Sequence, residues 1–442
     1  MTALTVNNKS HLLGRVIKGS IWTVAGNFAS QILRFGSNLV LTHLLFPEAF
    51  GLMALIQSIL IAMHLVSDVG LQQSLMRHEH ANEPHFYNTI WTVQIIKGLI
   101  VFGAMLIASP IAAAFYHQPQ LLTLTPAMAL TAVLSGFNST KAILLNRQLK
   151  VGTLTVMDLG VQVLGIVVML AWARLSPSPW ALVAGNLASS MAAVAARHYW
   201  LEGPGNRLHW DKSVIKEVWS FGGWVMVSST VTFLVGEGRT LLNASLVDTR
   251  TLGLLSLSTT LAFVIWSALQ QICGRVLFPA YVEVWQQRPQ NFSSVVARAR
   301  RIQLWGGTAV AAGLVFGGQA LVHCFYDARY QDAGWFLRIQ AAGAVFSFLT
   351  MSYSGVLWVL NRPKLAALLL AVQTVFMVIC ILGGYWLGGV HGLVIGSSFT
   401  GVLLYPVSAY VYHHFGLFQP RVDMPIIAIG VCLALYLFLH GV

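Results

Sequence analysis

The chain has 442 residues, of which 56% are hydrophobic and 9% are charged, and its mean hydropathy is +0.70. Soluble domains carry about 25% charged residues, so this composition excludes a soluble enzyme held by a single anchor. The formal net charge of +12 raises the alternative of a nucleic-acid partner, which the positions of the basic residues argue against below.

Apolar stretches of membrane-spanning length follow one another along the whole chain. A membrane helix needs ~20 mainly apolar residues, and about thirteen stretches meet that length. We expect spans at residues 17–45, 51–73, 88–108, 120–145, 153–174, 179–199, 219–247, 252–275, 302–324, 335–360, 365–388, 391–414 and 424–442. Residues 1–16 are polar and are expected to lie in the cytoplasm or at the membrane surface, with no cleavable signal peptide. The fold class is an all-α polytopic membrane protein.

The basic residues indicate the orientation of these spans. With the N-terminus in the cytoplasm, nearly all Lys and Arg residues near the ends of the spans or between them fall on the cytoplasmic side. The outer side receives only Arg174, Arg250, Arg329 and Arg338. This asymmetry follows the positive-inside rule. The sequence therefore predicts a cytoplasmic N-terminus, and it argues against nucleic acid because the basic residues mark topology rather than a binding face.

An internal repeat relates the two halves of the chain. An offset of 202 residues matches Trp22 with Trp224, Gly36 with Gly238, Leu44 with Leu246, Gly51 with Gly253, Leu52 with Leu254, and Leu55 with Leu257. A second match pairs Leu145-Asn146-Arg147 with Leu360-Asn361-Arg362. An even number of spans separates equivalent helices, which gives both halves the same orientation.

The repeat predicts two parallel six-helix bundles. We expect the first at 17–200 and the second at 218–415, joined by a cytoplasmic loop at 201–217 and followed by about one extra helix at 416–442. Two such bundles facing each other leave a cavity between them. This is the architecture of an alternating-access transporter.

Three cations fall deep inside the expected spans, away from their ends, namely Arg34, Lys97 and Arg239. A charge at the centre of a membrane helix costs roughly 2.5–3.5 kcal/mol on insertion scales, so each should face protein or a wet cavity. By the repeat, Arg34 corresponds to a position three residues before Arg239, on the same helix face. Arginine offers a fork for phosphate and lysine a point charge, which predicts an anionic headgroup site. The alternative is that each cation pairs with a carboxylate and holds helices together.

Other polar residues in the spans suggest coupling and sugar contacts. Asp68, Asp158 and Glu237 are candidates for coupling transport to H⁺ or Na⁺, with helix-end or packing roles as the alternative. Amides are concentrated in the first, seventh and eighth spans, where they suit sugar hydroxyls or bonds between helices. They are Asn27, Gln31, Asn38, Asn243 and Gln270. The chain has no phosphate-binding loop for ATP, and we expect no metal or organic cofactor.

Several motifs resemble a known family. LLFPEAFGLMAL at 44–55, SDVGL at 67–71 and LLNRQLKVGTL at 144–154 resemble Wzx-type oligosaccharide flippases and polysaccharide exporters. These belong to the multidrug/oligosaccharidyl-lipid/polysaccharide exporter superfamily. The resemblance implies a MATE-like fold in the bacterial inner membrane, with two lobes that rock around a cationic cavity.

The resemblance also implies a function and partners. Such proteins move undecaprenyl-pyrophosphate-linked oligosaccharide from the cytoplasmic to the periplasmic leaflet, next to membrane lipids and to polymerase or export machinery. By this resemblance, Arg34, Lys97 and Arg239 would meet the pyrophosphate.

Two other functions are the alternatives to a flippase. A cation-coupled exporter of small molecules or drugs has the same fold, but its relatives often carry a carboxylate in the first span, and none occurs here. An integral-membrane polysaccharide polymerase or glycosyltransferase would need a sizeable loop with catalytic carboxylates or histidines. The predicted loops are short, so we expect a transporter rather than an enzyme.

Overall fold

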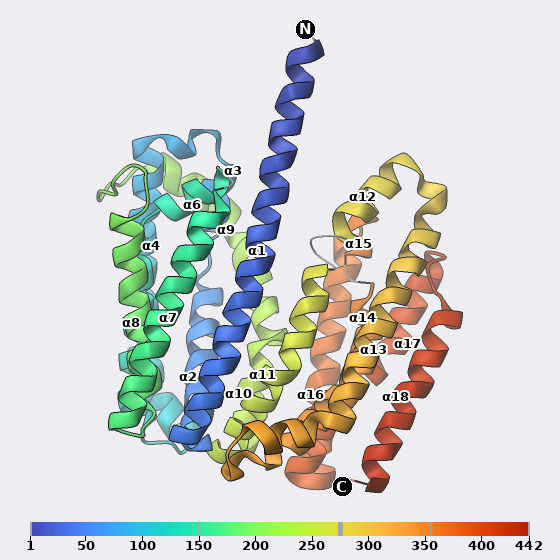
Figure 1. Cartoon of the computed structure of the whole chain (residues 1–442). Helices are drawn as coiled ribbons and strands as arrows, with labels where there is room; N and C mark the ends of the chain where they lie inside the picture. The colour runs from blue at the N-terminus through green and yellow to red at the C-terminus, as the bar shows by residue number, and fades with distance from the viewer. Residues whose placement is uncertain (1, 149, 273–276, 354, 441–442) are drawn as a thin grey trace. The chain divides into compact units, whose positions relative to one another are not determined.

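The structure is a computed structural model that describes residues 2–148, 150–272, 277–353 and 355–440. All regular structure within these ranges is helical (Figure 1), which confirms the predicted all-α fold. The chain forms two compact units. Unit 1 comprises residues 1–46 and 55–233, and unit 2 comprises residues 47–54 and 234–442.

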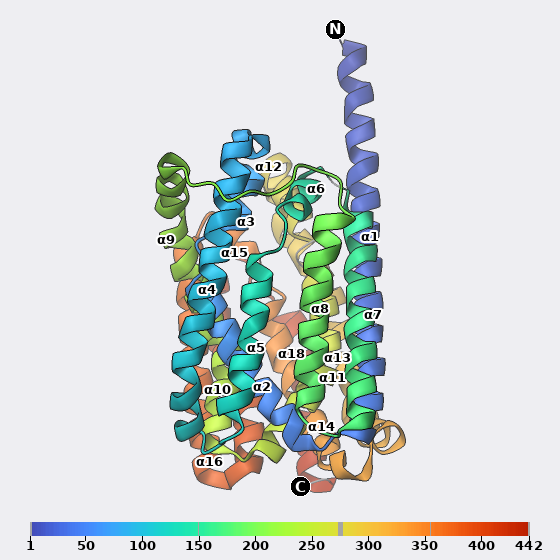
Figure 2. The same ribbon diagram turned by 90° about the vertical axis from the view of Figure 1, so that its left-hand side faces the viewer.

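Unit 1 is a set of long helices that pack in pairs. Helix α4 packs on α5, and α7 packs on both α8 and α1 (Figure 2). The helices are α1 (Thr2–Leu44), α2 (Pro47–Val66), α3 (Leu71–Arg77), η1 (Glu79–Asn82), α4 (Pro84–Phe115), α5 (Leu121–Gly136), α6 (Lys141–Arg147), α7 (Val151–Leu175), α8 (Trp180–Tyr199) and α9 (Lys212–Val235). The polar residues expected as a separate N-terminal segment are continuous with α1.

The expected span 120–145 is broken into α5 and α6, which meet at 58°. The last carbonyls of a helix have no partner within it. Here the side-chain amide of Gln94 on α4 donates to the carbonyls of the last two residues of α5, Ser135 and Gly136, at 2.9 and 3.2 Å, and to that of Asn138 just beyond the helix at 3.2 Å. One glutamine therefore fixes the end of α5 and the position of the bend.

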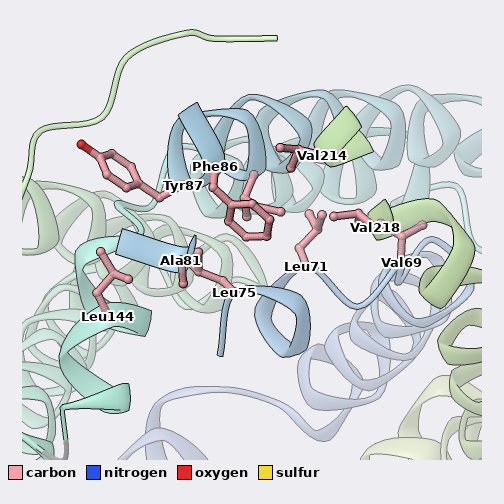
Figure 3. Close-up of a cluster of buried hydrophobic side chains, with 10 residues drawn as sticks. Val69, Leu71, Leu75, Ala81, Phe86, Tyr87, Leu144, Val214 and Val218 are labelled. Carbon is pink, nitrogen blue, oxygen red and sulfur yellow. The ribbon is translucent and has the colours of Figure 1, made fainter. Parts of the chain in front are cut away.

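The start of α9 belongs to unit 1 because it is packed there by apolar side chains. Val218 lies beside Leu71 and Val69, and Val214 lies near Phe86 (Figure 3). The compact units therefore divide the chain differently from the expected lobes 17–200 and 218–415, because this cluster holds α9 against α3 and α4. The lobe boundaries stay a prediction.

Asp211 forms the N-cap of α9. Its carboxylate accepts the backbone N–H of Ser213 at 2.8 Å, which satisfies one of the unpaired donors of the first turn. The hydrogen bonds from Ser213 lower the pKa of Asp211 below its ordinary value. The helix start that follows the 201–211 loop is thus set by a local sequence signal.

Unit 2 is organised around one buried helix, α14, which contacts α11, α13, α16, α17 and α18. Most of the buried residues of α14 are small or apolar, and most of the length of this helix is buried. The helices are α10 (Glu237–Leu246), α11 (Thr249–Ile272), α12 (Phe278–Gln287), η3 (Pro289–Asn291), α13 (Phe292–Phe325), η4 (Ala328–Tyr330), α14 (Asp332–Met351), α15 (Val356–Val359), α16 (Pro363–Ser398), α17 (Thr400–His414) and α18 (Pro420–His440).

The start of α2 and the start of α11 cross inside unit 2 through a pair of glycines. A methyl group on Gly51 would overlap the backbone carbonyl of Thr249, and one on Gly253 would overlap the carbonyl of Pro47. Gly51 and Gly253 are equivalent in the sequence repeat, and so are Pro47 and Thr249. Gly51 meets Thr249, and its equivalent Gly253 meets Pro47, the equivalent of Thr249. The contact is therefore reciprocal, as in a two-fold interface.

Helix α16 is a hairpin of two arms rather than one rod. It turns at Gly388 and Gly389, where Gly389 has a φ of +57° that favours glycine. The arms press backbone on backbone, since a methyl group on Gly392 would overlap the carbonyl of Gly384, and one on Gly396 would overlap that of Cys380. Small residues four apart allow such close approach between membrane helices. The turn separates the two expected spans 365–388 and 391–414, and the second span continues from the short arm of the hairpin into α17.

Seven stretches of the described residues are long and apolar enough to cross a bilayer, and the bent pair α5 and α6 raises this to eight. They are Pro47–Val66, Pro84–Phe115, Val151–Leu175, Pro289–Phe325, Ala328–Val359, Pro363–His414 and Pro420–Leu439. The other expected spans coincide with described helices, except that residues 273–275 of the span 252–275 lie outside the described residues. Their crossing of the membrane stays a prediction. The expected span 219–247 is broken at Gly236, between α9 and α10.

Candidate functional site

A cavity of about 500 Å³ lies within unit 1, where α2 and α8 end and α7 begins. The break between α5 and α6 forms another part of its wall. Most of its lining side chains are polar or charged, among them His64, Asp68, Gln72, Gln73, Gln94, Lys97, Ser135, Asn138, Ser139, Asn146, Asp158 and Arg197. Three residues predicted from the sequence, Asp68, Lys97 and Asp158, are thus brought together in one place.

Lys97 of α4 pairs with Asp68 across this cavity. The ammonium lies 3.7 Å from Oδ1 of Asp68, and the two side chains are 21% and 26% exposed. The same oxygen accepts the N–H of Gly70 at 3.1 Å, and the other accepts a hydrogen bond from Ser229 on α9. Gly70 has a φ of +67°, so Asp68 also stabilises the tight turn between α2 and α3. The alternative weighed for Lys97, a carboxylate partner, describes its position here.

Asp158 of α7 pairs with Arg197 of α8 in the same cavity. Nη2 of Arg197 lies 3.2 Å from Oδ1 of Asp158. Sequence analysis does not identify Arg197 as the partner of Asp158. The signal that connects them is depth, because Asp158 lies near the start of one span and Arg197 near the end of the next.

Arg34 lies on α1 and is exposed. Among the described residues we find no ion pair for its guanidinium. The predicted amides of this helix are also at least partly accessible, with Asn27 exposed and Gln31 and Asn38 half-buried. A neighbouring contact fixes the helix, because Ser30 and Gln162 of α7 exchange hydrogen bonds of 2.7 and 3.0 Å.

Arg239 lies in α10, directly after the break at Gly236. Nη2 donates to the hydroxyl of Ser397 on α16 at 3.1 Å, and no ion pair to a carboxylate occurs within the described part of the chain. Glu237 occupies the first turn of the same helix, where a negative charge is favoured by the helix dipole. Asn243 is buried and Gln270 of α11 is exposed.

A charged network in unit 2 was missed by the sequence analysis. Arg300 of α13 and Asp423 of α18 are both 0% exposed, and Nη2 lies 2.9 Å from Oδ1. Nε of Arg300 donates to the hydroxyl of Ser352 at 2.9 Å, and its guanidinium stacks on the ring of Tyr353 at 3.6 Å. Tyr405 donates to the other carboxylate oxygen at 3.0 Å. Sequence analysis does not identify Arg300, because counting the charges on each side of the membrane does not show which cations are buried.

The fold agrees with solved structures of membrane transporters. A multidrug resistance MATE family transporter of the MOP superfamily, solved in an inward-facing conformation, matches with a TM-score of 0.66 over 90% of this chain and 95% of that chain, at 13% identity. The lipid II flippase MurJ in an inward closed conformation matches with a TM-score of 0.67 over 96% of this chain and 93% of that chain, at 11% identity. The predicted MATE-like fold is confirmed.

Two curated proteins share sequence with the chain. The lipopolysaccharide biosynthesis protein WzxC of Escherichia coli (strain K12) is 21% identical over 273 residues, which span 61% of this chain and 55% of the relative. The teichuronic acid biosynthesis protein TuaB of Bacillus subtilis (strain 168) is 22% identical over 370 residues, which span 80% of this chain and 73% of the relative.

A family model describes most of the chain directly. The model for polysaccharide biosynthesis proteins matches residues 40–334, which contain Lys97, Asp68, Asp158, Glu237 and Arg239. That range is well over half of the 442 residues. The chain is therefore a member of the polysaccharide biosynthesis protein family, built on the fold of the MATE transporters and MurJ.

Proposed function

We propose that the protein is a flippase that moves an undecaprenyl-pyrophosphate-linked oligosaccharide from the cytoplasmic to the periplasmic leaflet of the bacterial inner membrane. Membership of the polysaccharide biosynthesis family supports a role in polysaccharide export. A transporter rather than an enzyme fits the short loops between long helices. Alternating access between the two halves is part of the proposal, with polymerase or export machinery as further partners.

The observation that carries the proposal is that two arginines in expected spans have no carboxylate partner among the described residues. Arg34 is exposed on α1, and Arg239 is held by the hydroxyl of Ser397. A guanidinium at this depth needs a counter-charge. Since no acidic partner for either was found among the described residues, a phosphate group of the substrate suits both. Lys97 is a weaker headgroup candidate, because a phosphate would have to compete with Asp68.

The coupling ion is a separate part of the proposal. Asp68 and Asp158 are each engaged in an ion pair with a cation of the cavity. Glu237, next to the helix break at Gly236, is the stronger candidate for H⁺ or Na⁺ coupling.

Alanine at Arg34 or Arg239 should reduce polysaccharide export about tenfold or more, because a hydrogen bond to a charged group contributes about 1.5–3 kcal/mol. The measurement is surface polysaccharide in a deletion strain complemented with each variant. The lipid-linked intermediate should accumulate at the same time.

Arg174 provides the matched control, since it is an exposed arginine in the last turn of α7. Its alanine variant should export normally. Normal export by both Arg34→Ala and Arg239→Ala would contradict the headgroup role. Efflux of a fluorescent organic cation by the wild type, with polysaccharide unchanged by the deletion, would favour the drug exporter instead.

The orientation is tested separately with topology reporters. A reporter fused in the loop at 201–211 should be cytoplasmic, and one fused at 326–331 should be periplasmic, because the basic residues predict opposite sides for these segments. Activity of an alkaline phosphatase fusion is expected only at the second site. The reverse pattern would mean that the N-terminus faces the periplasm.

A further inference from the structure

We propose that the cavity of unit 1 binds sugar residues of the substrate through their hydroxyl groups. This inference rests on the proposed flippase function and adds to it the part of the substrate that this cavity recognises. In this arrangement Arg34 and Arg239 bind the pyrophosphate, and the cavity of unit 1 binds the saccharide.

The charges of the cavity favour a neutral ligand. Its two cations, Lys97 and Arg197, each lie beside a carboxylate, at 3.7 and 3.2 Å. The pairs cancel, so the cavity has little net attraction for a phosphate. The carboxylates keep further lone pairs, and the side chain of Asp158 is 57% exposed. The cations and carboxylates of these pairs can donate hydrogen bonds to a neutral ligand and accept them from it, but the pairs together do not attract an anion.

Two buried polar atoms in the cavity wall have no hydrogen-bond partner among the described residues. They are Oδ1 of Asn138, which is an acceptor, and Nε of Arg197, which is a donor. A buried polar group without a partner costs about 1–3 kcal/mol, so a small rotation of either side chain toward a ligand in the cavity is favoured. A hydroxyl group donates and accepts at once. A polyhydroxylated ligand therefore suits this wall better than an anion, which only accepts, or an ammonium, which only donates.

The remaining lining has the same character. Gln72, Gln73 and Asn146 add amides that can each donate and accept. Asn146 belongs to the Leu-Asn-Arg motif that the repeat places in both halves. Its equivalent, Asn361, has a φ of +56° and forms a turn instead. The motif thus contributes to a cavity wall in unit 1 and to a backbone turn in unit 2.

The size of the cavity fits the proposal. Its volume of about 500 Å³ lies in the ~300–1,000 Å³ range of small-molecule sites. The cavity is formed at a broken helix, where backbone carbonyls are already held by Gln94. A rigid wall of this kind positions hydroxyl groups without ordering a loop.

The test uses purified full-length protein in lipid nanodiscs and two probes. One is the soluble oligosaccharide that mild acid releases from the lipid-linked intermediate of the deletion strain. The other is undecaprenyl pyrophosphate without sugar. Asn138→Leu removes an acceptor that holds no other group, so the fold should be retained. It should weaken binding of the oligosaccharide about tenfold, the effect of one or two hydrogen bonds, and leave undecaprenyl pyrophosphate binding unchanged.

Asn186→Leu is the matched control, because Asn186 bonds to its own helix outside the cavity. It should leave both affinities unchanged. Unchanged oligosaccharide binding in Asn138→Leu, or equal weakening by both asparagine variants, would overturn the inference. If the wild type binds undecaprenyl pyrophosphate but not the oligosaccharide, the sugar site fails and the flippase stands. If it binds neither, the flippase proposal fails as well.

Discussion

Replacing Asp423 with alanine should destabilise unit 2 by about 3–5 kcal/mol, the range measured when one partner of a buried ion pair is removed. The guanidinium of Arg300 would then be fully buried without a counter-charge, since both side chains are 0% exposed. The hydroxyl of Tyr405 would lose its acceptor at the same time. Arg300→Ala should have a similar effect, because it leaves the carboxylate uncompensated.

Thermal unfolding of the purified protein in one detergent measures the effect. The control is Glu202→Ala, which removes a surface pair in which Lys150 and Glu202 are 51% and 90% exposed and should change stability by less than about 1 kcal/mol. The double variant Arg300→Met/Asp423→Leu should recover much of the loss, because apolar residues replace a desolvated pair at little cost. Equal unfolding temperatures for Asp423→Ala and Glu202→Ala would contradict the expected role of the pair.

Alanine at Gly51 or Gly253 should destabilise the crossing of α2 and α11 by about 1–3 kcal/mol, as overpacking does elsewhere. The added methyl group would overlap a backbone carbonyl, of Thr249 in one case and of Pro47 in the other. A carbonyl cannot move aside as a flexible side chain can, so the two helices must separate. Because the contact is reciprocal, the two variants should lose similar amounts.

Gly36→Ala and Gly103→Ala serve as controls for helix propensity, since no atom lies within 4 Å of a methyl group at either site. Alanine is favoured over glycine in a helix by ~1 kcal/mol, so these variants should be neutral or more stable. The amount of folded protein recovered in detergent and its unfolding temperature give the comparison. Stabilisation by Gly51→Ala would show that the crossing is looser than the backbone contact indicates.

The positions of the helices could be predicted from the sequence because apolar length alone sets them. The repeat could also be recognised in the sequence, because both halves keep a glycine, Gly51 and Gly253, where the backbones of α2 and α11 touch. Helix breaks were harder. The span 219–247 breaks at Gly236, and the span 120–145 bends without a proline at the bend. Neither segment carries a sequence signal strong enough to predict that the helix ends there.

The partners of the charged residues could not be predicted, because they depend on the rotation of each helix about its axis. Lys97 and Asp68 were both identified, but nothing in their spacing shows that they meet at 3.7 Å. Arg300 and Asp423 are separated by 123 residues, and both lie next to the polar segments where exposed charges are expected. A rule that assigns cations to a side of the membrane does not separate exposed residues from buried ones.

The hairpin of α16 has a consequence for motion. Its arms touch through Gly384, Gly392 and Gly396, and rotation of either arm about its axis would insert a side chain where only a hydrogen atom fits. Sliding along the contact meets the same obstacle at every fourth residue. In the proposed transport cycle, residues 380–396 therefore travel as one rigid body, and bending occurs beyond this contact rather than between the arms.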